Sequence, residues 1–222
     1  MRTMKNFDWG PVTEEGQRIL TKEIFTDQMY ERYDQVRKGD IVVDLGATVG
    51  EFSCSILGRK PLHVYALEPS PQTFPFLVKN TRGYPVTPIN KAIADKDWDV
   101  ICPGICHSDS RIVPGITPAT LVRLYALDHV DFLKTDCEGG EYSVFTPDNL
   151  GFIYDKVGAI AGEWHLSTPE LKEQFREFRD NFLTHFDYAV HDVGGNDITK
   201  LLMTEDFIRF YNEVFIYIRR GR

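Results

Sequence analysis

Four side chains that can exchange protons or bind a metal lie in two short segments, each at the end of an apolar run. Asp136 and Glu138 follow the first run, and Glu163 and His165 follow the second. Ionisable groups at such positions are costly unless they pair or bind a ligand. An imidazole titrates near neutral pH and can accept a proton from a hydroxyl. These residues are candidates for catalysis, and an ion pair between Lys134 and a carboxylate is the structural alternative.

A glycine turn and a later acidic residue indicate a site for a nucleoside-containing ligand. The turn is the segment DLGATVGEFS at residues 44–53, directly after a β-branched run. Gly46 allows a sharp bend, and Gly50 allows the backbone to approach a ligand, while a helix that starts near Gly50 would direct free amides at a carboxylate. Glu68, about 24 residues beyond Asp44, can accept both ribose hydroxyls, as the acid of a dinucleotide site does. The turn lacks the G-x-G-x-x-G spacing, which disfavours an NAD-type site.

Alternating strands and helices predict how these segments come together. Apolar, β-branched runs predict strands at residues 41–45, 62–67, 86–94, 131–136, 157–163, 186–193 and 213–218. Thr168 caps a helix that continues to about Phe182. This order predicts a doubly wound sheet with right-handed crossovers. Because parallel strands end at one cleft, we expect the four candidate catalytic residues to meet there.

The two remaining parts of the chain have weaker patterns. Residues 14–38 carry apolar side chains at near-helical spacing, which predicts a helix. This helix either packs on the domain or covers the mouth of the site, and packing is the favoured interpretation. Residues 97–130 contain several Pro and Gly, so we expect an irregular crossover with substrate-facing loops.

Composition and charge restrict the class of protein. With 222 residues, of which 42% are hydrophobic, the chain fits one α/β domain with a full core. The net charge of −8 disfavours a nucleic-acid partner, because phosphate binding needs clustered Lys and Arg, and favours a neutral or cationic small molecule. No run approaches the ~20 apolar residues of a membrane span, and the N-terminus shows no apolar signal core. We expect a soluble, cytoplasmic protein without a membrane partner; the sequence indicates no oligomeric state.

The four segments, in this order, resemble the FkbM family of S-adenosylmethionine-dependent methyltransferases over roughly residues 39–166. The most specific match is DFLKTDCEGGEYSVF at residues 131–145, followed by the DLGATVGEFS turn. Thr48 stands where an asparagine is commoner, and Gly140 replaces a frequent alanine. The resemblance implies a Rossmann-like class I fold at residues 39–222, with a mostly parallel seven-stranded twisted sheet, flanking helices and an antiparallel C-terminal strand. A helical extension at residues 1–38 would pack on it.

The resemblance also implies an activity, the O-methylation of a hydroxyl on a sugar, a glycan or a small natural product, with S-adenosylmethionine as cofactor. The implied cofactor-binding residues are Asp44, Gly46, Ala47, Thr48, Gly50, Glu51, Phe52, Glu68, Pro69, Ala92, Ile93 and Asp136. Within this set the glycine turn lines the methionine portion, Glu68 holds the ribose, and Ala92 and Ile93 lie beside adenine. Asp136 faces the methionine amino group or the reacting centre.

An alcohol is a weak nucleophile at neutral pH, so methyl transfer needs a base or a metal. One hypothesis makes His165 the proton acceptor, oriented by Glu138 or Glu163. The rival hypothesis binds Mg²⁺ at Asp136 with Glu163 or Glu138, which would acidify a bound hydroxyl; the base without a metal is slightly favoured. At the level of function, the alternatives are an RNA or other nucleic-acid methyltransferase and a non-catalytic cofactor-binding module.

Overall fold

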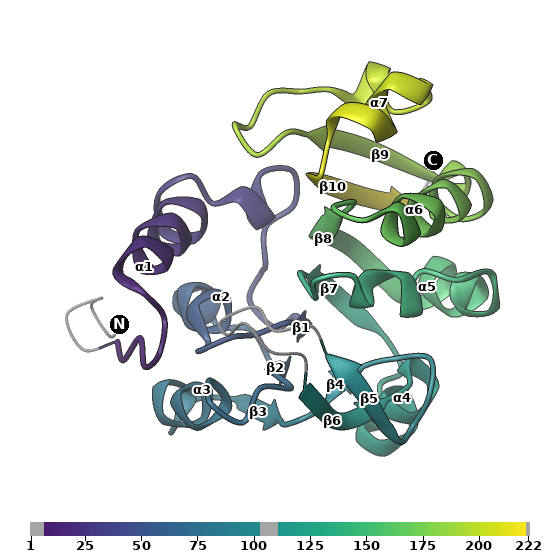
Figure 1. Ribbon diagram of the computed structural model, residues 1–222. Helices are drawn as coiled ribbons and strands as arrows, with labels where there is room; N and C mark the ends of the chain where they lie inside the picture. The colour runs from purple at the N-terminus through teal and green to yellow at the C-terminus, as the bar shows by residue number, and fades with distance from the viewer. Residues whose placement is uncertain (1–6, 103–110, 221–222) are drawn as a thin grey trace.

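A twisted, mostly parallel sheet forms the centre of the molecule (Figure 1). The computed structural model describes residues 7–102 and 111–220. In spatial order the strands of this sheet are β3 (Val86–Ile89), β2 (His63–Leu67), β1 (Ile41–Leu45), β7 (Val130–Thr135), β8 (Val157–His165), β10 (Glu213–Arg220) and β9 (Phe186–His191). Neighbouring strands pair in parallel except at β10, which runs antiparallel to β8 and β9. The predicted seven-stranded sheet with an antiparallel C-terminal strand is confirmed.

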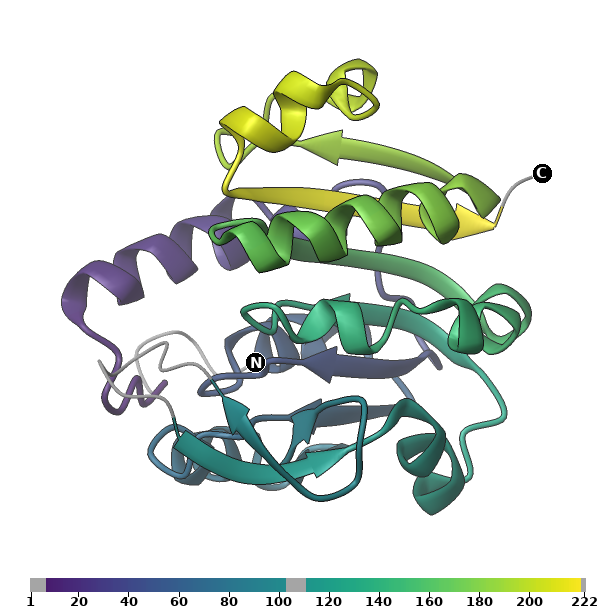
Figure 2. The same cartoon turned by 45° about the vertical axis from the view of Figure 1, so that its right-hand side comes forward.

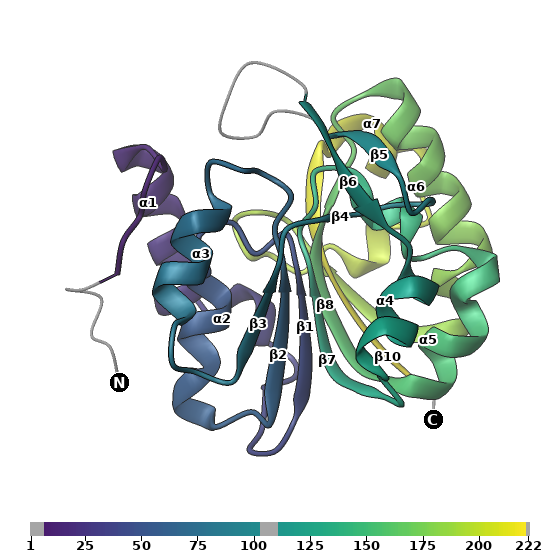
Figure 3. The same cartoon turned by 90° about the horizontal axis from the view of Figure 1, so that it is seen from below.

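Helices cover both faces of this sheet (Figure 3). On one side lie α2 (Glu51–Ser55) and α3 (Phe74–Thr81), and on the other lie α4 (Pro118–Tyr125), α5 (Leu150–Lys156) and α6 (Pro169–Asn181). The strands are therefore apolar on both faces: Val43 and Leu133 pack into the cluster that contains α6, and Val42 and Phe132 pack into the opposite one. Thr168 caps α6 as predicted, and this helix runs along the sheet beside β10 (Figure 2).

The helices are short, and a last one, α7 (Glu205–Phe210), precedes β10. Across residues 7–102 and 111–220, none of the helices combines the length and the apolar character that a membrane crossing needs.

The N-terminal segment begins as a regular helix but does not continue as one. α1 (Glu14–Leu20) passes into a π-helical stretch at Thr21–Thr26, and a short 3₁₀ helix follows at Met29–Glu31. Between them Gln28 has a left-handed backbone, with a φ of 49°. The single helix predicted over 14–38 is therefore wrong in its extent, because the chain turns at Gln28 to pack its next residues against the sheet. The predicted domain boundary after this segment stays a prediction.

One strand predicted over 86–94 is wrong as a single element. The chain leaves the sheet at Asn90, whose side-chain amide donates hydrogen bonds to the carbonyl groups of Glu68 and Pro69 at 2.8 and 3.2 Å. It then enters β4 (Ala92–Ile93), which belongs to a second sheet. The amide contact of Asn90 is a tertiary interaction, so the apolar pattern on both sides of it could not reveal the break.

The irregular crossover predicted over 97–130 is wrong for the described residues, while residues 103–110 of this stretch lie outside them. β5 (Asp99–Cys102) and β6 (Arg111–Ile116) form an antiparallel hairpin, and β4 joins it to make a three-stranded sheet. Gly115 does not mark a loop in this segment. A Cβ at this position would lie 2.6 Å from the carbonyl oxygen of Trp98, so the glycine permits two backbone segments to approach closely.

Candidate functional site

A cavity of about 450 Å³ lies at the carboxyl ends of β1, β2 and β7, with β4 and β5 on one side. This volume is in the range of small-molecule sites. Among the predicted cofactor residues, the cavity is lined by Gly46, Thr48, Glu68, Pro69, Ala92, Ile93 and Asp136. Those absent from its lining are buried behind the turn, namely Asp44, Ala47, Gly50, Glu51 and Phe52. The structure thus separates the predicted set into residues of the wall and residues that support it.

Glycine is required at two positions of the turn, for a different structural reason at each. Gly46 has a φ of 75°, and a Cβ at this position would lie 1.7 Å from the carbonyl oxygen of Asp136. Only glycine therefore lets the turn after β1 meet the end of β7. Gly50 also has a positive φ, of 91°, but a Cβ there would meet Leu77 of α3 at 2.9 Å. The role expected for Gly50, to let the backbone approach a ligand, does not agree with this position.

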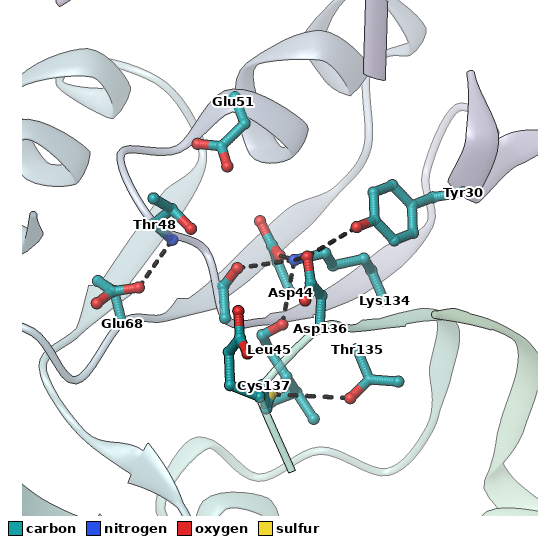
Figure 4. A network of polar contacts seen from close by, with 12 residues as sticks. Tyr30, Asp44, Leu45, Thr48, Glu51, Glu68, Lys134, Thr135, Asp136 and Cys137 are labelled. Atoms are coloured by element: carbon teal, nitrogen blue, oxygen red, sulfur yellow. Dashed lines mark hydrogen bonds and ion pairs between the residues drawn. The ribbon is translucent and has the colours of Figure 1, made fainter. Parts of the chain in front are cut away.

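Lys134 joins the ends of β1 and β7 from within the protein (Figure 4). Its ammonium donates hydrogen bonds to the carbonyl groups of Leu45 at 3.2 Å and Gly46 at 2.7 Å. It also lies 3.4 Å from Asp44 Oδ1 and 3.9 Å from Asp136 Oδ2. Burial opposes the charge, but Asp44 and Asp136 keep the pKa of Lys134 above its ordinary value. Lys134 therefore has the structural pairing role, with Asp44 as its nearest carboxylate.

Glu68 fixes the glycine turn while it faces the cavity. Its carboxylate accepts hydrogen bonds from the amides of Thr48 and Ser70 and from the hydroxyl of Thr73, each at 2.8 Å. Burial raises the pKa of Glu68 to about 7 in spite of these bonds. Thr48 has a left-handed backbone with a φ of 47°, which a β-branched residue adopts less readily than asparagine. The contact with Glu68 helps to hold it there.

The four candidate catalytic residues meet at the end of β7, where Asp136 and Glu138 line the cavity and Glu163 and His165 lie behind them, outside its lining. Glu163 and His165 alternate along β8, beside the end of β7. His165 Nε2 lies 3.5 Å from Glu138 Oε2 and 4.0 Å from Asp136 Oδ1. Asp136, Glu163 and His165 each offer one atom within 4.8 Å of the others, as a divalent cation would require. Glu138 is not part of the strand, because β7 ends at Thr135 and Glu138 has a left-handed backbone with a φ of 52°.

The orientation of His165 depends on Glu141, a residue that is not among the candidates predicted from the sequence. Glu141 is fully buried, accepts hydrogen bonds from the amides of Cys137 at 2.7 Å and Gly139 at 2.8 Å, and accepts another from His165 Nδ1 at 3.1 Å. We expected Glu138 or Glu163 to orient the imidazole, but the partner of His165 Nδ1 is Glu141. Glu138 lies near the other ring nitrogen, Nε2. The signal was present in the sequence, because a second Glu so close to Glu138 needs partners if it is buried.

Carboxylates outnumber cations around Asp136 and His165, and this excess of negative charge shifts the pKa values of the groups. Burial alone would lower the pKa of His165, but the hydrogen bond and charge of Glu141, with Asp136 and Glu138, raise it to about 10. Burial and the charge of Asp136 raise the pKa of Glu163 to about 9. Burial and the charges of Asp136 and Glu213 raise the pKa of Glu23, from the N-terminal segment, to about 7. At neutral pH the imidazole is therefore cationic and Glu163 holds a proton.

Residues 107–190, which contain the acidic segment after β7 and the end of β8, match the family model of the methyltransferase FkbM domain. A relative, the 31-O-demethyl-FK506 methyltransferase FkbM of Streptomyces tacrolimicus, is 31% identical over 108 residues, which are 48% of this chain and 42% of the relative. This part of the chain is therefore similar to the methyltransferase FkbM domain. The predicted resemblance is confirmed, although the aligned part spans less than half of the relative's length.

Solved structures share the fold of the chain. The fibrillarin–Nop5p complex gives a TM-score of 0.55 at 15% identity and covers 91% of this chain and 83% of that chain. A putative methyltransferase from Streptococcus mutans in complex with SAH gives 0.52 at 10% identity, with 90% and 97% coverage. A putative rRNA methylase from Clostridium thermocellum gives 0.51 at 13% identity, with 94% and 98% coverage. At these identities the likeness shows the fold alone, which is that of the class I methyltransferases.

Replacement of Lys134 by Met should strongly destabilise the domain. The change leaves Asp44 buried without its cation, and the loss of one partner of a buried ion pair typically costs about 3–5 kcal/mol. Urea unfolding measures the difference. Lys156→Met, at an exposed position of α5, is the matched control and should change the free energy of unfolding by less than about 0.5 kcal/mol. Equal, small effects of both changes would show that Lys134 does not hold the strand ends together.

Replacement of Glu141 by Gln should lower the pKa of His165 from about 10 toward its ordinary value of 6.5. Because the raised pKa stabilises the folded state below pH 6.5 and this contribution disappears as the pH rises to about 10, the variant should lose most stability at low pH. An NMR titration of the imidazole and unfolding at several pH values measure both effects. Glu138→Gln, whose side chain is 36% exposed, should shift the pKa less; a larger shift than for Glu141→Gln contradicts the assignment.

Proposed function

We propose that this chain binds S-adenosylmethionine in the cavity and transfers the methyl group to a hydroxyl of a sugar, a glycan or a small natural product. The observation that carries the proposal is the cavity wall, where Gly46, Glu68 and Asp136 come from three neighbouring strand ends. Ligands of open α/β sheets bind at this edge. The name of the distant relative, an O-demethyl-FK506 methyltransferase, supports a natural-product hydroxyl as acceptor.

Each part of the cofactor has a counterpart in the cavity. Glu68 would accept a ribose hydroxyl: donors from its own loop and the glycine turn use three of its about four lone pairs, which fixes the carboxylate and leaves one acceptor site. Ala92 and Ile93 supply apolar surface for adenine on the β4 side. Gly46 and Asp136 would border the methionine end. To accept both ribose hydroxyls, as expected from the sequence, Glu68 would have to use one oxygen lone pair for a ribose hydroxyl and for one of its present donors together.

The acidic cluster next to Asp136, on the wall of the cavity, favours a neutral or cationic acceptor. Its carboxylates come from the N-terminal segment, from the turn after β7 and from β8, and their fields overlap at Glu163. A nucleic-acid backbone would meet repulsion here rather than the clustered Lys and Arg that phosphates need. We therefore propose a small-molecule or glycan acceptor and not RNA or DNA, although two structures of similar fold are described as a putative rRNA methylase and an rRNA methylase.

The chemistry is an in-line displacement at the methyl carbon, so alignment of acceptor oxygen, carbon and sulfur supplies much of the rate. The hydroxyl proton must leave, and His165 Nε2 is the proposed acceptor because Glu141 binds its other nitrogen. Since the imidazole is cationic at neutral pH in the free protein, only the small neutral fraction can act as a base. The rival version places a divalent cation at Asp136, Glu163 and His165, where it would acidify the hydroxyl.

Glu68→Gln tests cofactor binding. The variant should bind S-adenosylhomocysteine about tenfold or more weakly, because a hydrogen bond to a charged carboxylate is lost. In the unchanged protein the affinity should fall as the pH drops below about 7, where Glu68 becomes protonated, and the variant should lack this dependence. Calorimetry measures both, and Glu173→Gln, on an exposed part of α6, is the control. The proposal fails if the unchanged protein does not bind S-adenosylhomocysteine.

A pH profile with and without EDTA tests the two versions of the chemistry, with methyl transfer followed over a panel of hydroxyl acceptors. If His165 is the base, kcat should rise as the pH approaches about 10 and persist in excess EDTA. His165→Gln should then lower kcat by about 100-fold or more and leave affinity for S-adenosylhomocysteine nearly unchanged. Activity that disappears in EDTA and returns with Mg²⁺ would exclude the metal-free base and support the cation site.

A further inference from the structure

Tyr30, in the N-terminal segment, reaches the end of β7 and touches the site (Figure 4). Its hydroxyl donates a hydrogen bond of 2.8 Å to Asp136 Oδ2, across 106 residues of sequence. The side chain is 2% exposed, and a buried tyrosine hydroxyl needs a polar partner. Here the partner is a carboxylate that lines the cavity. The bond therefore links the N-terminal segment directly to the proposed methyl-transfer site.

The ring of Tyr30 is held by its neighbours and not only by its hydroxyl. It makes edge contacts with Phe52, behind the glycine turn, and with Phe215 of β10, each with ring centres 5.6 Å apart. The ammonium of Lys134 lies 5.2 Å from the ring centre, on its face. These contacts do not involve the hydroxyl, so a phenylalanine at this position would keep them.

The backbone around Tyr30 has separate anchors. The hydroxyl of Tyr217 in β10 donates a 2.8 Å hydrogen bond to the carbonyl of Met29. The buried carboxylate of Glu31 accepts a hydrogen bond from the amide of Val36 at 2.9 Å and forms an ion pair with Arg59 at 2.9 Å. These contacts hold the backbone at Tyr30 independently of its hydrogen bond to Asp136.

The two oxygens of Asp136 are in different surroundings as a result. Oδ2 receives the Tyr30 hydroxyl at 2.8 Å and lies 3.9 Å from the Lys134 ammonium. Oδ1 lies on the other side, 4.0 Å from His165 Nε2. The terminal torsion of an aspartate is broad, so without a fixed donor the carboxylate would rotate and either oxygen could face the cavity.

We propose that Tyr30 is a positioning residue, whose hydroxyl fixes the carboxylate of Asp136 so that Oδ1 faces the cationic end of the cofactor. The N-terminal segment is then part of the active site, although it lies outside residues 107–190 that match the family model. This inference rests on the proposed binding of S-adenosylmethionine. Its rival is that Tyr30 only fills space between the glycine turn and β10.

Tyr30→Phe and Tyr217→Phe form a matched pair for the test. Each removes one hydroxyl and one hydrogen bond from the same segment, and only the first bond reaches Asp136. The probes are sinefungin, an analogue with an amine in place of the sulfonium methyl group, and neutral S-adenosylhomocysteine. Calorimetry with both ligands gives the preference for the cationic one, and melting temperatures report folding.

Tyr30→Phe should reduce the preference for sinefungin about tenfold, the scale of one hydrogen bond to a charged group. Tyr217→Phe should leave the preference unchanged, with a similar, small drop in melting temperature. Asp136→Asn should also reduce the preference, and Tyr30→Phe added to it should cause no further loss. An unchanged preference in Tyr30→Phe, or a further loss in the double variant, would overturn the inference. If the unchanged protein still binds both ligands, the proposed function remains supported in that case. Binding of neither ligand would overturn both.

Discussion

The buried ammonium of Lys134 is the interaction on which the geometry of the site depends. It lies within β7 yet binds the carbonyl groups at the end of β1, with Asp44 and Asp136 beside it. A buried cation costs several kcal/mol unless carboxylates and carbonyl groups surround it. Gly46 allows this arrangement, because any side chain there would collide with the carbonyl of Asp136. The cation, the glycine turn and the carboxylate on the cavity wall are therefore one unit, and none of them can be placed without the others.

The charge balance of the acceptor side follows from the same unit. Lys134 is committed to the strand ends. Beside it, the hydrogen bond and charge of Glu141, with the charges of Asp136 and Glu138, raise the pKa of His165. Burial and the charge of Asp136 raise the pKa values of Glu163 and Glu23, so these carboxyl groups hold protons more readily. In the proposed reaction a sulfonium becomes a neutral thioether, and the hydroxyl releases a proton. The positive charge lost from the cofactor thus reappears as a proton, and an acidic cluster can keep that charge within the site.

The local parts of the fold could be predicted from the sequence, and the contacts between distant parts could not. β1 matches its predicted bounds because a β-branched run lies between turn residues, and α6 begins where Thr168 caps it. The strand over 86–94 was predicted as one element because nothing in the local pattern reports that Asn90 bonds to another loop. For the site, the residue types and strand ends brought Asp136 and His165 together. Glu141, 24 residues from His165, and Tyr30, 106 residues from Asp136, act through tertiary contacts that spacing does not encode.

The groups around Asp136 come from two parts of the chain. The segment that matches the family model supplies Asp136, Glu141 and His165, so the groups that would act on the hydroxyl belong to the shared part of the domain. From the N-terminal segment, the hydroxyl of Tyr30 donates a hydrogen bond to Asp136, and the charge of Asp136 helps to raise the pKa of Glu23. This segment is anchored to β10 by contacts that involve neither residue. A change at Glu23 or Tyr30 can therefore alter the electrostatic surroundings of Asp136 while the backbone of the segment stays anchored to β10.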